Sequence, residues 1–132
     1  MRTFKMKWNG KAVEDCGSYM SKEAKTFVTD FRNMLKRELS PYGIEMVSLK
    51  PNHYDCFGFV KKGDHYIYIS YSIPRYGSCI NFYLSGSFDG VLYRTAKNEK
   101  DYTGGRNHFS SIEYLPNAII SLFSCMKSGL AC

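Results

Sequence analysis

The chain has 132 residues, a length that fits one domain with one hydrophobic core. Its hydrophobic content of 44% and charged content of 23% are ordinary for a folded protein and exclude wholesale disorder. The net charge of +6 favours an acidic partner such as nucleic acid, and a merely soluble protein with a positive surface is the alternative.

The N-terminal segment predicts a small β-ribbon. Apolar residues alternate with lysines over Phe4–Trp8, which is typical of a half-buried strand. Asn9-Gly10 follows, and this pair is a common two-residue hairpin turn because both positions tolerate positive φ. Lys11–Glu14 then supplies the returning arm.

The next segment predicts an amphipathic helix. Ser21 has the character of an N-cap, and Pro41 stops the helix because proline disfavours helical geometry in the residue before it. Apolar residues recur at three- and four-residue spacing over about 18 residues, as one buried helix face requires. They are Ala24, Phe27, Val28, Phe31, Met34, Leu35 and Leu39.

A run of strands separated by short loops follows the helix, and such loops predict an antiparallel meander of about five strands. The expected strands are Ile44–Lys50, Tyr54–Lys61, His65–Ile73, Cys79–Leu84 and Val91–Ala96. The third has the clearest alternation, with Ile67, Ile69 and Tyr71 on one face and Tyr66 and Tyr68 on the other.

The C-terminal part predicts a polar loop and a second helix. Lys97–Asn107 is charged, contains a Gly-Gly pair and has no apolar period. A short turn is expected at Ser110–Tyr114, followed by a helix with Pro116 at its first position and Gly129 as its stop. The fold class is therefore α+β: one domain over residues 1–132, with two helices packed on one face of the sheet.

The polar loop and its flanks are the best candidate for a binding surface. Cations, acceptors and a stacking ring lie close together there, and glycine allows a backbone to approach a ligand closely. A structural loop with an internally satisfied salt bridge is the alternative. The candidate partner-binding residues are Arg94, Lys97, Lys100, Asp101, Tyr102, Gly104, Gly105, Arg106, Asn107 and His108.

A second candidate surface is the outer face of the first helix. Lys25, Arg32 and Lys36 form a basic stripe there. A solvated helix face explains such a stripe more often than contact with phosphates does.

Catalytic and metal-binding residues are not expected. His53, Asp55 and Cys56 lie within four residues, but Cys56 falls in an apolar strand, where a buried inert thiol is the usual occupant. His65 and His108 lack further ligands nearby in the sequence. We expect no enzyme, no metal and no cofactor.

The cysteines and the apolar stretches of the sequence indicate the cellular compartment. The five cysteines are odd in number and include no CxxC pair, so we expect reduced thiols in the cytoplasm. No signal peptide or membrane-spanning stretch is apparent, and no membrane partner is expected.

Several segments resemble small orphan proteins carried by phages and conjugative elements of gut Firmicutes. The resemblance covers roughly positions 6 to 126 and transfers no catalytic residues. Its segments include Ser21–Lys25, Leu35–Leu39, Lys50–Tyr54, Tyr71–Gly77, Val91–Lys97 and Lys100–Gly105.

Small proteins of this setting include anti-CRISPR inhibitors, and the resemblance implies an inhibitor that binds the type II RNA-guided effector nuclease or its nucleic acid. The basic charge disfavours mimicry of the DNA backbone. The alternative is a basic nucleic-acid-binding accessory protein of the mobile element. A homodimer is a further alternative if the tyrosine face of the sheet is uncovered.

Overall fold

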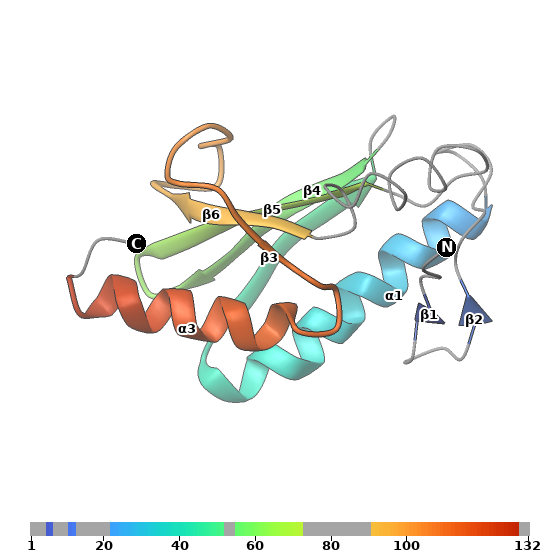
Figure 1. Ribbon diagram of the computed structural model, residues 1–132, viewed down its shortest axis with the longest axis horizontal. Helices are drawn as coiled ribbons and strands as arrows, with labels where there is room; N and C mark the ends of the chain where they lie inside the picture. The colour runs from blue at the N-terminus through green and yellow to red at the C-terminus, as the bar shows by residue number, and fades with distance from the viewer. Residues whose placement is uncertain (1–4, 7–10, 13–21, 52–54, 73–90, 130–132) are drawn as a thin grey trace.

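The computed structural model describes residues 5–6, 11–12, 22–51, 55–72 and 91–129 (Figure 1). A two-stranded pair and a five-stranded antiparallel sheet are accompanied by two helices. The strands are β1 (Lys5–Met6), β2 (Lys11–Ala12), β3 (Glu45–Pro51), β4 (Asp55–Lys62), β5 (His65–Ser72), β6 (Val91–Ala96) and β7 (His108–Ser110). The helices are α1 (Lys22–Leu39) and α3 (Leu115–Lys127), with a 3-10 turn at Ser40–Tyr42.

Helix α1 has the extent that its apolar spacing predicts, and its end is fixed by local backbone chemistry. Gly43 takes the left-handed conformation, with φ of 74°, and its N–H donates to the Ser40 carbonyl at 3.0 Å. The chain thereby reverses into β3. The predicted N-cap, Ser21, lies outside the described residues.

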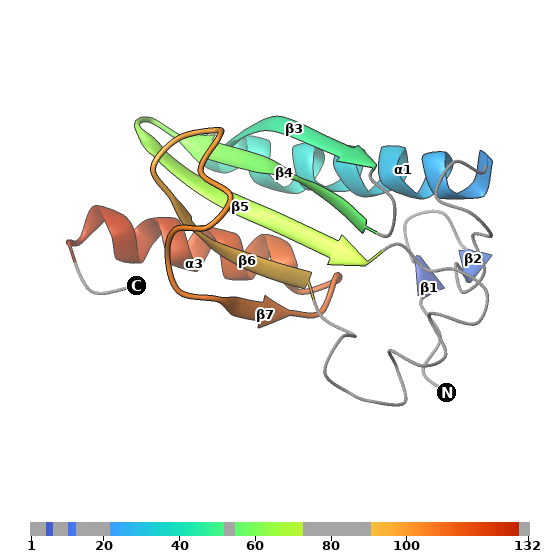
Figure 2. The same cartoon turned by 90° about the horizontal axis from the view of Figure 1, so that it is seen from above.

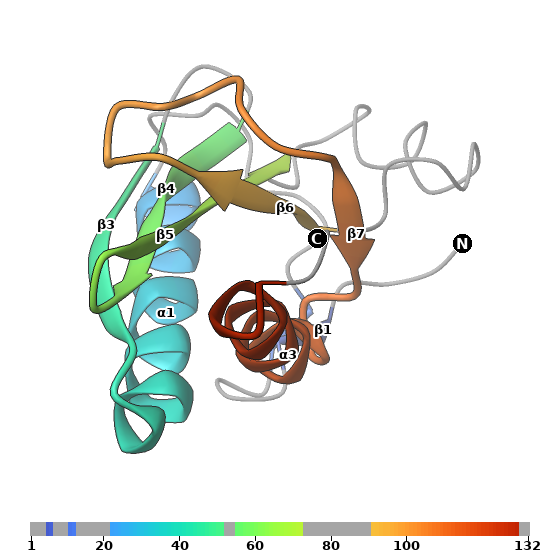
Figure 3. The same ribbon diagram turned by 90° about the vertical axis from the view of Figure 1, so that its left-hand side faces the viewer.

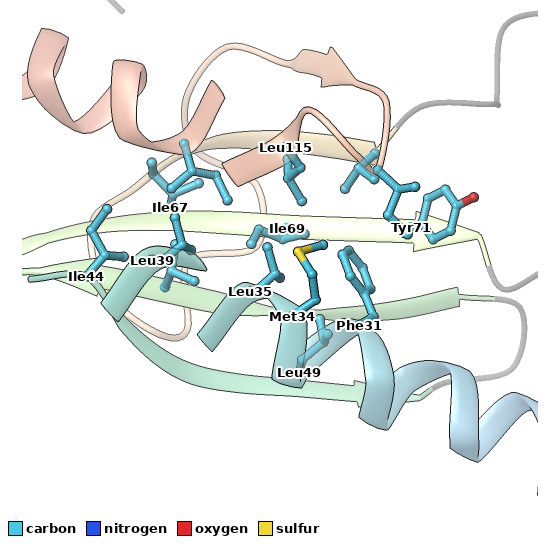
Figure 4. Packing of buried hydrophobic residues seen from close by; sticks show 14 of the residues in the cluster. Phe31, Met34, Leu35, Leu39, Ile44, Leu49, Ile67, Ile69, Tyr71 and Leu115 are labelled. Carbon is cyan, nitrogen blue, oxygen red and sulfur yellow. The ribbon is translucent and has the colours of Figure 1, made fainter. Parts of the chain in front are cut away.

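The core lies between the two helices and one face of the five-stranded sheet. Figure 3 shows α1 and α3 on the same side of the sheet, as predicted. In Figure 4, Phe31 and Leu35 of α1 point toward Ile69 of β5. The rings of Phe31 and Tyr71 meet edge to face, with centroids 5.9 Å apart. Burial of these apolar side chains supplies the main favourable term in folding.

The strand order is β3-β4-β5-β6-β7, so β5 is the central strand (Figure 2). Tyr66–Ser70 of β5 pair with β4 on one side and with β6 on the other. The sequence predicted that Cys79–Leu84 pairs with this strand. That pairing is wrong along Tyr66–Ser70, because β4 and β6 already occupy both edges of β5 there. The segment itself lies outside the described residues.

The fifth strand is one that the sequence did not predict. His108–Ser110 forms β7, which pairs antiparallel with β6 through Val91↔Ser110, Leu92↔Phe109 and Tyr93↔His108. Helix α3 begins at Leu115, so Pro116 stands at its second position, where its missing N–H is still harmless. Gly129, with φ of 76°, follows the helix end as expected.

The N-terminal ribbon stays a prediction. The described pair β1–β2 is antiparallel, with Lys5 opposite Ala12 and Met6 opposite Lys11. The Asn9-Gly10 turn and the remainder of the expected arms lie outside the described residues.

Gly58 of β4 sits where the neighbouring strand comes too close for a side chain. The β3–β4 register shifts between Met46 and Ser48, and this irregularity brings the backbone of β3 toward Gly58. A Cβ at Gly58 would overlap the Ser48 carbonyl oxygen and lie 2.8 Å from the Leu49 Cα. Glycine is required there because the obstacle is backbone rather than a movable side chain.

We therefore predict that Gly58→Ala lowers the free energy of unfolding by about 3 kcal/mol, the upper part of the range for forced overpacking. Urea denaturation measures this as a lower midpoint at an unchanged slope. Gly63→Ala is the matched control: no atom lies within 4 Å of its added Cβ, and only its φ of 59° opposes the change. A loss at Gly58 no larger than at Gly63 would contradict the proposed clash.

Candidate functional site

The loop between β6 and β7 crosses the sheet on the face opposite the helices (Figure 3). Its Tyr102 ring packs edge to face on three aromatic side chains that belong to β4 and β5. The centroid distances are 5.8 Å to Phe57, 5.4 Å to Phe59 and 5.9 Å to Tyr68. We call Phe57, Phe59, Tyr68 and Tyr102 the aromatic cluster. Tyr102 covers part of the tyrosine face of the sheet, and an uncovered tyrosine face was the condition for the homodimer alternative.

Asp101 organises the loop by accepting hydrogen bonds from backbone N–H groups. The Lys97 N–H donates to Oδ2 at 2.9 Å, and the Gly104 N–H donates to Oδ1 at 2.9 Å. The Thr103 N–H adds a longer bond of 3.4 Å to Oδ1. These bonds lower the pKa of Asp101, that from Lys97 most, because they favour the charged carboxylate.

The Gly104-Gly105 pair is required by the same turn. A Cβ on Gly104 would overlap Asp101 Oδ2. Gly105 has φ of 78°, and a Cβ there would lie 2.5 Å from the Thr95 carbonyl oxygen. Both glycines thus serve close contacts within the protein itself.

Arg94 also has contacts within the protein. It stands opposite Tyr68 in the β5–β6 register, and its guanidinium carbon lies 4.6 Å from the centre of the Tyr68 ring. Its Nη1 donates to Asn107 Oδ1 at 3.0 Å. Arg94 and Asn107 therefore join the two ends of the loop.

The remaining loop cations do not share one face, because Arg106 lines a groove between β7 and α3 on the helix side of the sheet. The side chains of Lys97, Lys100 and Arg106 are exposed. Lys97 and Lys100 contribute to the fold of the loop through their backbone N–H groups, which donate to Asp101 and to Asn98 Oδ1. These side chains give the loop positive charge. Replacing them would remove that charge and leave the described backbone hydrogen bonds of the loop in place.

The basic stripe of α1 is separate from the loop. Helix α1 packs on the other face of the sheet (Figure 3). Arg32 Nη1 donates to the Leu49 carbonyl at 3.2 Å and so satisfies a partly buried acceptor on the edge strand β3. Lys25 and Lys36 are exposed. The two predicted basic sets do not form one continuous surface.

His108, the last of the predicted loop residues, lies on the helix side of the sheet. Its ring stacks on Tyr93 with centroids 5.2 Å apart. Burial raises the pKa of Tyr93. Both side chains line a groove of about 580 Å³ between β7 and α3, together with Arg106 and Tyr114.

The cysteines differ from the expected set of five reduced thiols. Cys56 forms no disulfide and is fully buried in the core, in agreement with the predicted burial. Cys125 of α3 is disulfide-bonded, and the other cysteine lies outside the described residues. The prediction of a reduced thiol is therefore wrong for Cys125. His53 also lies outside the described residues, so the arrangement of His53 and Cys56 stays untested.

A hollow of about 420 Å³ opens between the loop and strands β3 and β4. Rings and charged side chains line it, among them Lys50, Phe57, Phe59, Glu99, Lys100 and Tyr102. Sequence reasoning missed Lys50, Phe57 and Phe59. The alternation of Phe57 and Phe59 around Gly58 was the available signal, since it places both rings on one face of a strand.

Comparisons with protein-family models, curated proteins and solved structures found no match. Within residues 22–51, 55–72 and 91–129, no helix has the length and apolar character needed to cross a membrane. Across the same part of the chain, no cluster of three or more His, Cys, Asp or Glu side chains could hold a metal ion.

The Asp101 hydrogen bonds predict a pH dependence of the loop. A lowered folded pKa means that Asp101 contributes stability above the ordinary aspartate pKa, and that this contribution is lost as the pH falls through the lowered value. In an NMR titration, the amide signals of Lys97 and Gly104 should shift together with a midpoint below about 3.9, the ordinary aspartate value. Asp101→Asn should remove that transition. A midpoint at or above the ordinary value would contradict the role of Asp101.

Proposed function

We propose that this chain is a non-enzymatic binding protein that holds an anionic partner, nucleic acid, on the exposed cations of the loop between β6 and β7. The observation that carries the proposal is that the groups that hold the shape of the loop are different from its exposed cationic side chains. Backbone groups and Asp101 fix its shape, while the side chains of Lys97, Lys100 and Arg106 stay exposed. Cations attract phosphates, and a loop backbone that is already ordered presents them without a further ordering cost for that backbone.

Two settings suit such a protein. The segments Val91–Lys97 and Lys100–Gly105 resemble proteins of mobile elements, which favours an inhibitor of the type II RNA-guided effector nuclease acting on the nuclease or on its nucleic acid. The second candidate is a nucleic-acid-binding accessory protein of a phage or conjugative element. The mixture of rings and lysines around the hollow favours direct contact with nucleic acid.

One experiment separates the two settings. The protein is mixed with the guide-loaded nuclease, with the nuclease alone, and with free single-stranded and duplex nucleic acid. Stoichiometric binding to the nuclease with loss of cleavage supports the inhibitor. Binding to free nucleic acid and none to the nuclease supports the accessory protein. Binding to neither would overturn the proposed function.

The charged loop predicts a specific salt response. A variant with Lys97→Gln, Lys100→Gln and Arg106→Gln should bind nucleic acid more weakly, and its log affinity should depend less steeply on log salt. Loss of three phosphate contacts reduces that slope by about 2 for a single strand. Fluorescence anisotropy at several salt concentrations measures both quantities.

The matched control removes the same charge from the two helices instead of from the loop. Lys25, Lys36 and Lys127 are exposed residues of α1 and α3, and their replacement by Gln lowers the net charge equally. We expect a much smaller change in slope for this variant. An equal change would mean that net charge, rather than the loop, determines binding.

A further inference from the structure

The hollow beside the loop combines aromatic and cationic side chains from segments far apart in the sequence. Phe57 and Phe59 come from β4, Lys50 from β3, and Tyr102 and Lys100 from the loop. Lys50 is the direct register partner of Phe57, so its side chain starts on the same face of the sheet as that ring. Cations therefore flank the rings from two sides.

The geometry of the hollow is fixed before any ligand arrives. Phe59 is only 2% exposed and Tyr68 only 9% exposed, so the base of the aromatic cluster is packed. Tyr102 rests on that base and is still 45% exposed. The residues on both sides of Tyr102 are held by hydrogen bonds, through the Asp101 carboxylate and the Thr103 N–H. Part of a rigid aromatic surface is thus open to a planar ligand.

The size and charge of the hollow select one kind of occupant. Its volume of about 420 Å³ falls within the roughly 300–1,000 Å³ of small-ligand sites. Exposed lysines at 50 and 100 suit the phosphates on either side of a nucleotide. Glu99 also lines the hollow, and its carboxylate repels a phosphate but accepts hydrogen bonds from the amino group of a base.

We propose that this hollow holds one unpaired base of a single-stranded nucleic acid against Phe57 and Tyr102, with the neighbouring phosphates at Lys50 and Lys100. This inference rests on the proposed function and adds to it a selection for unpaired over paired strands. Bases inside a duplex are already stacked on one another and present no free face to the rings.

The test uses fluorescence anisotropy with four labelled 12-nucleotide probes: a single-stranded DNA, a single-stranded RNA, a DNA duplex, and a DNA strand in which abasic spacers replace the bases. The abasic strand keeps the phosphates and removes the stacking partners. Wild-type protein should bind at least one base-bearing strand about fivefold or more tightly than the abasic strand, as expected for stacking of a base. Preference for RNA or for DNA then identifies the source of the base.

Phe57→Leu removes a ring from the hollow without touching the hydrogen bonds of the loop. It should weaken binding of the base-bearing strand by about fivefold or more. Binding of the abasic strand and of the duplex should change less than twofold. Lys50→Gln, on an exposed side chain, should weaken binding of all strands and reduce the salt slope by about 0.7. Tyr42→Leu is the matched control, because Tyr42 is 53% exposed and does not line the hollow.

The outcomes separate this inference from the proposed function. Equal affinity for base-bearing and abasic strands, or a Phe57→Leu variant that binds as the wild type does, would overturn the base site and leave the basic loop standing. Binding to the nuclease alone would also overturn the base site. If Phe57→Leu lowers the midpoint of thermal unfolding, the test is decided by Lys50→Gln and by the abasic strand, because neither of them alters the packed rings.

Discussion

The hydrogen bonds to the Asp101 carboxylate are the constraint on which the outer face of this protein depends. The loop from β6 to β7 has little regular pairing of its own, so its backbone N–H groups need other partners. Asp101 accepts from Lys97 and Gly104 at 2.9 Å each and so closes the turn. The closed turn places Tyr102 on the rings of β4 and β5 and directs the loop cations to solvent. The charged surface and the hollow both follow from that closure.

The central strand β5 is packed on both faces, and aromatic side chains contribute to each. Ile67 and Ile69 face the helices and are fully buried. Tyr68 faces the other way, yet it is also buried, because Tyr102 and the Arg94 guanidinium cover it. The outer face is therefore partly a second, smaller aromatic core. Next to β3, where this cover ends, Phe57 and Tyr102 stay partly accessible beside Lys50 and Lys100.

The periodicities of the sequence predicted the fold class, both helices and four strands of the sheet, because each of these elements has an apolar face long enough to show its period. Strand β7 was missed since three residues carry no period, and its pairing with β6 is set by the closed loop between them. Arg32 was assigned to a solvent-facing stripe because nothing near it in the sequence reveals the Leu49 carbonyl of β3. The hollow was missed for the same reason: Lys50, Phe57 and Tyr102 meet only after the sheet and loop have formed.

The residues that make the loop distinctive in sequence are largely occupied within the protein. Asp101, Gly104, Gly105 and the Arg94–Asn107 pair all make close contacts inside the chain. Their pattern therefore has a structural role, which is to fix the shape of the loop. Under the proposed function, the side chains that this shape leaves exposed are the ones available to select a partner. Exposed cations raise affinity for any phosphate backbone, whereas a rigid ring surface distinguishes an unpaired base from a stacked one, so the aromatic hollow rather than the charge is where discrimination between partners can arise.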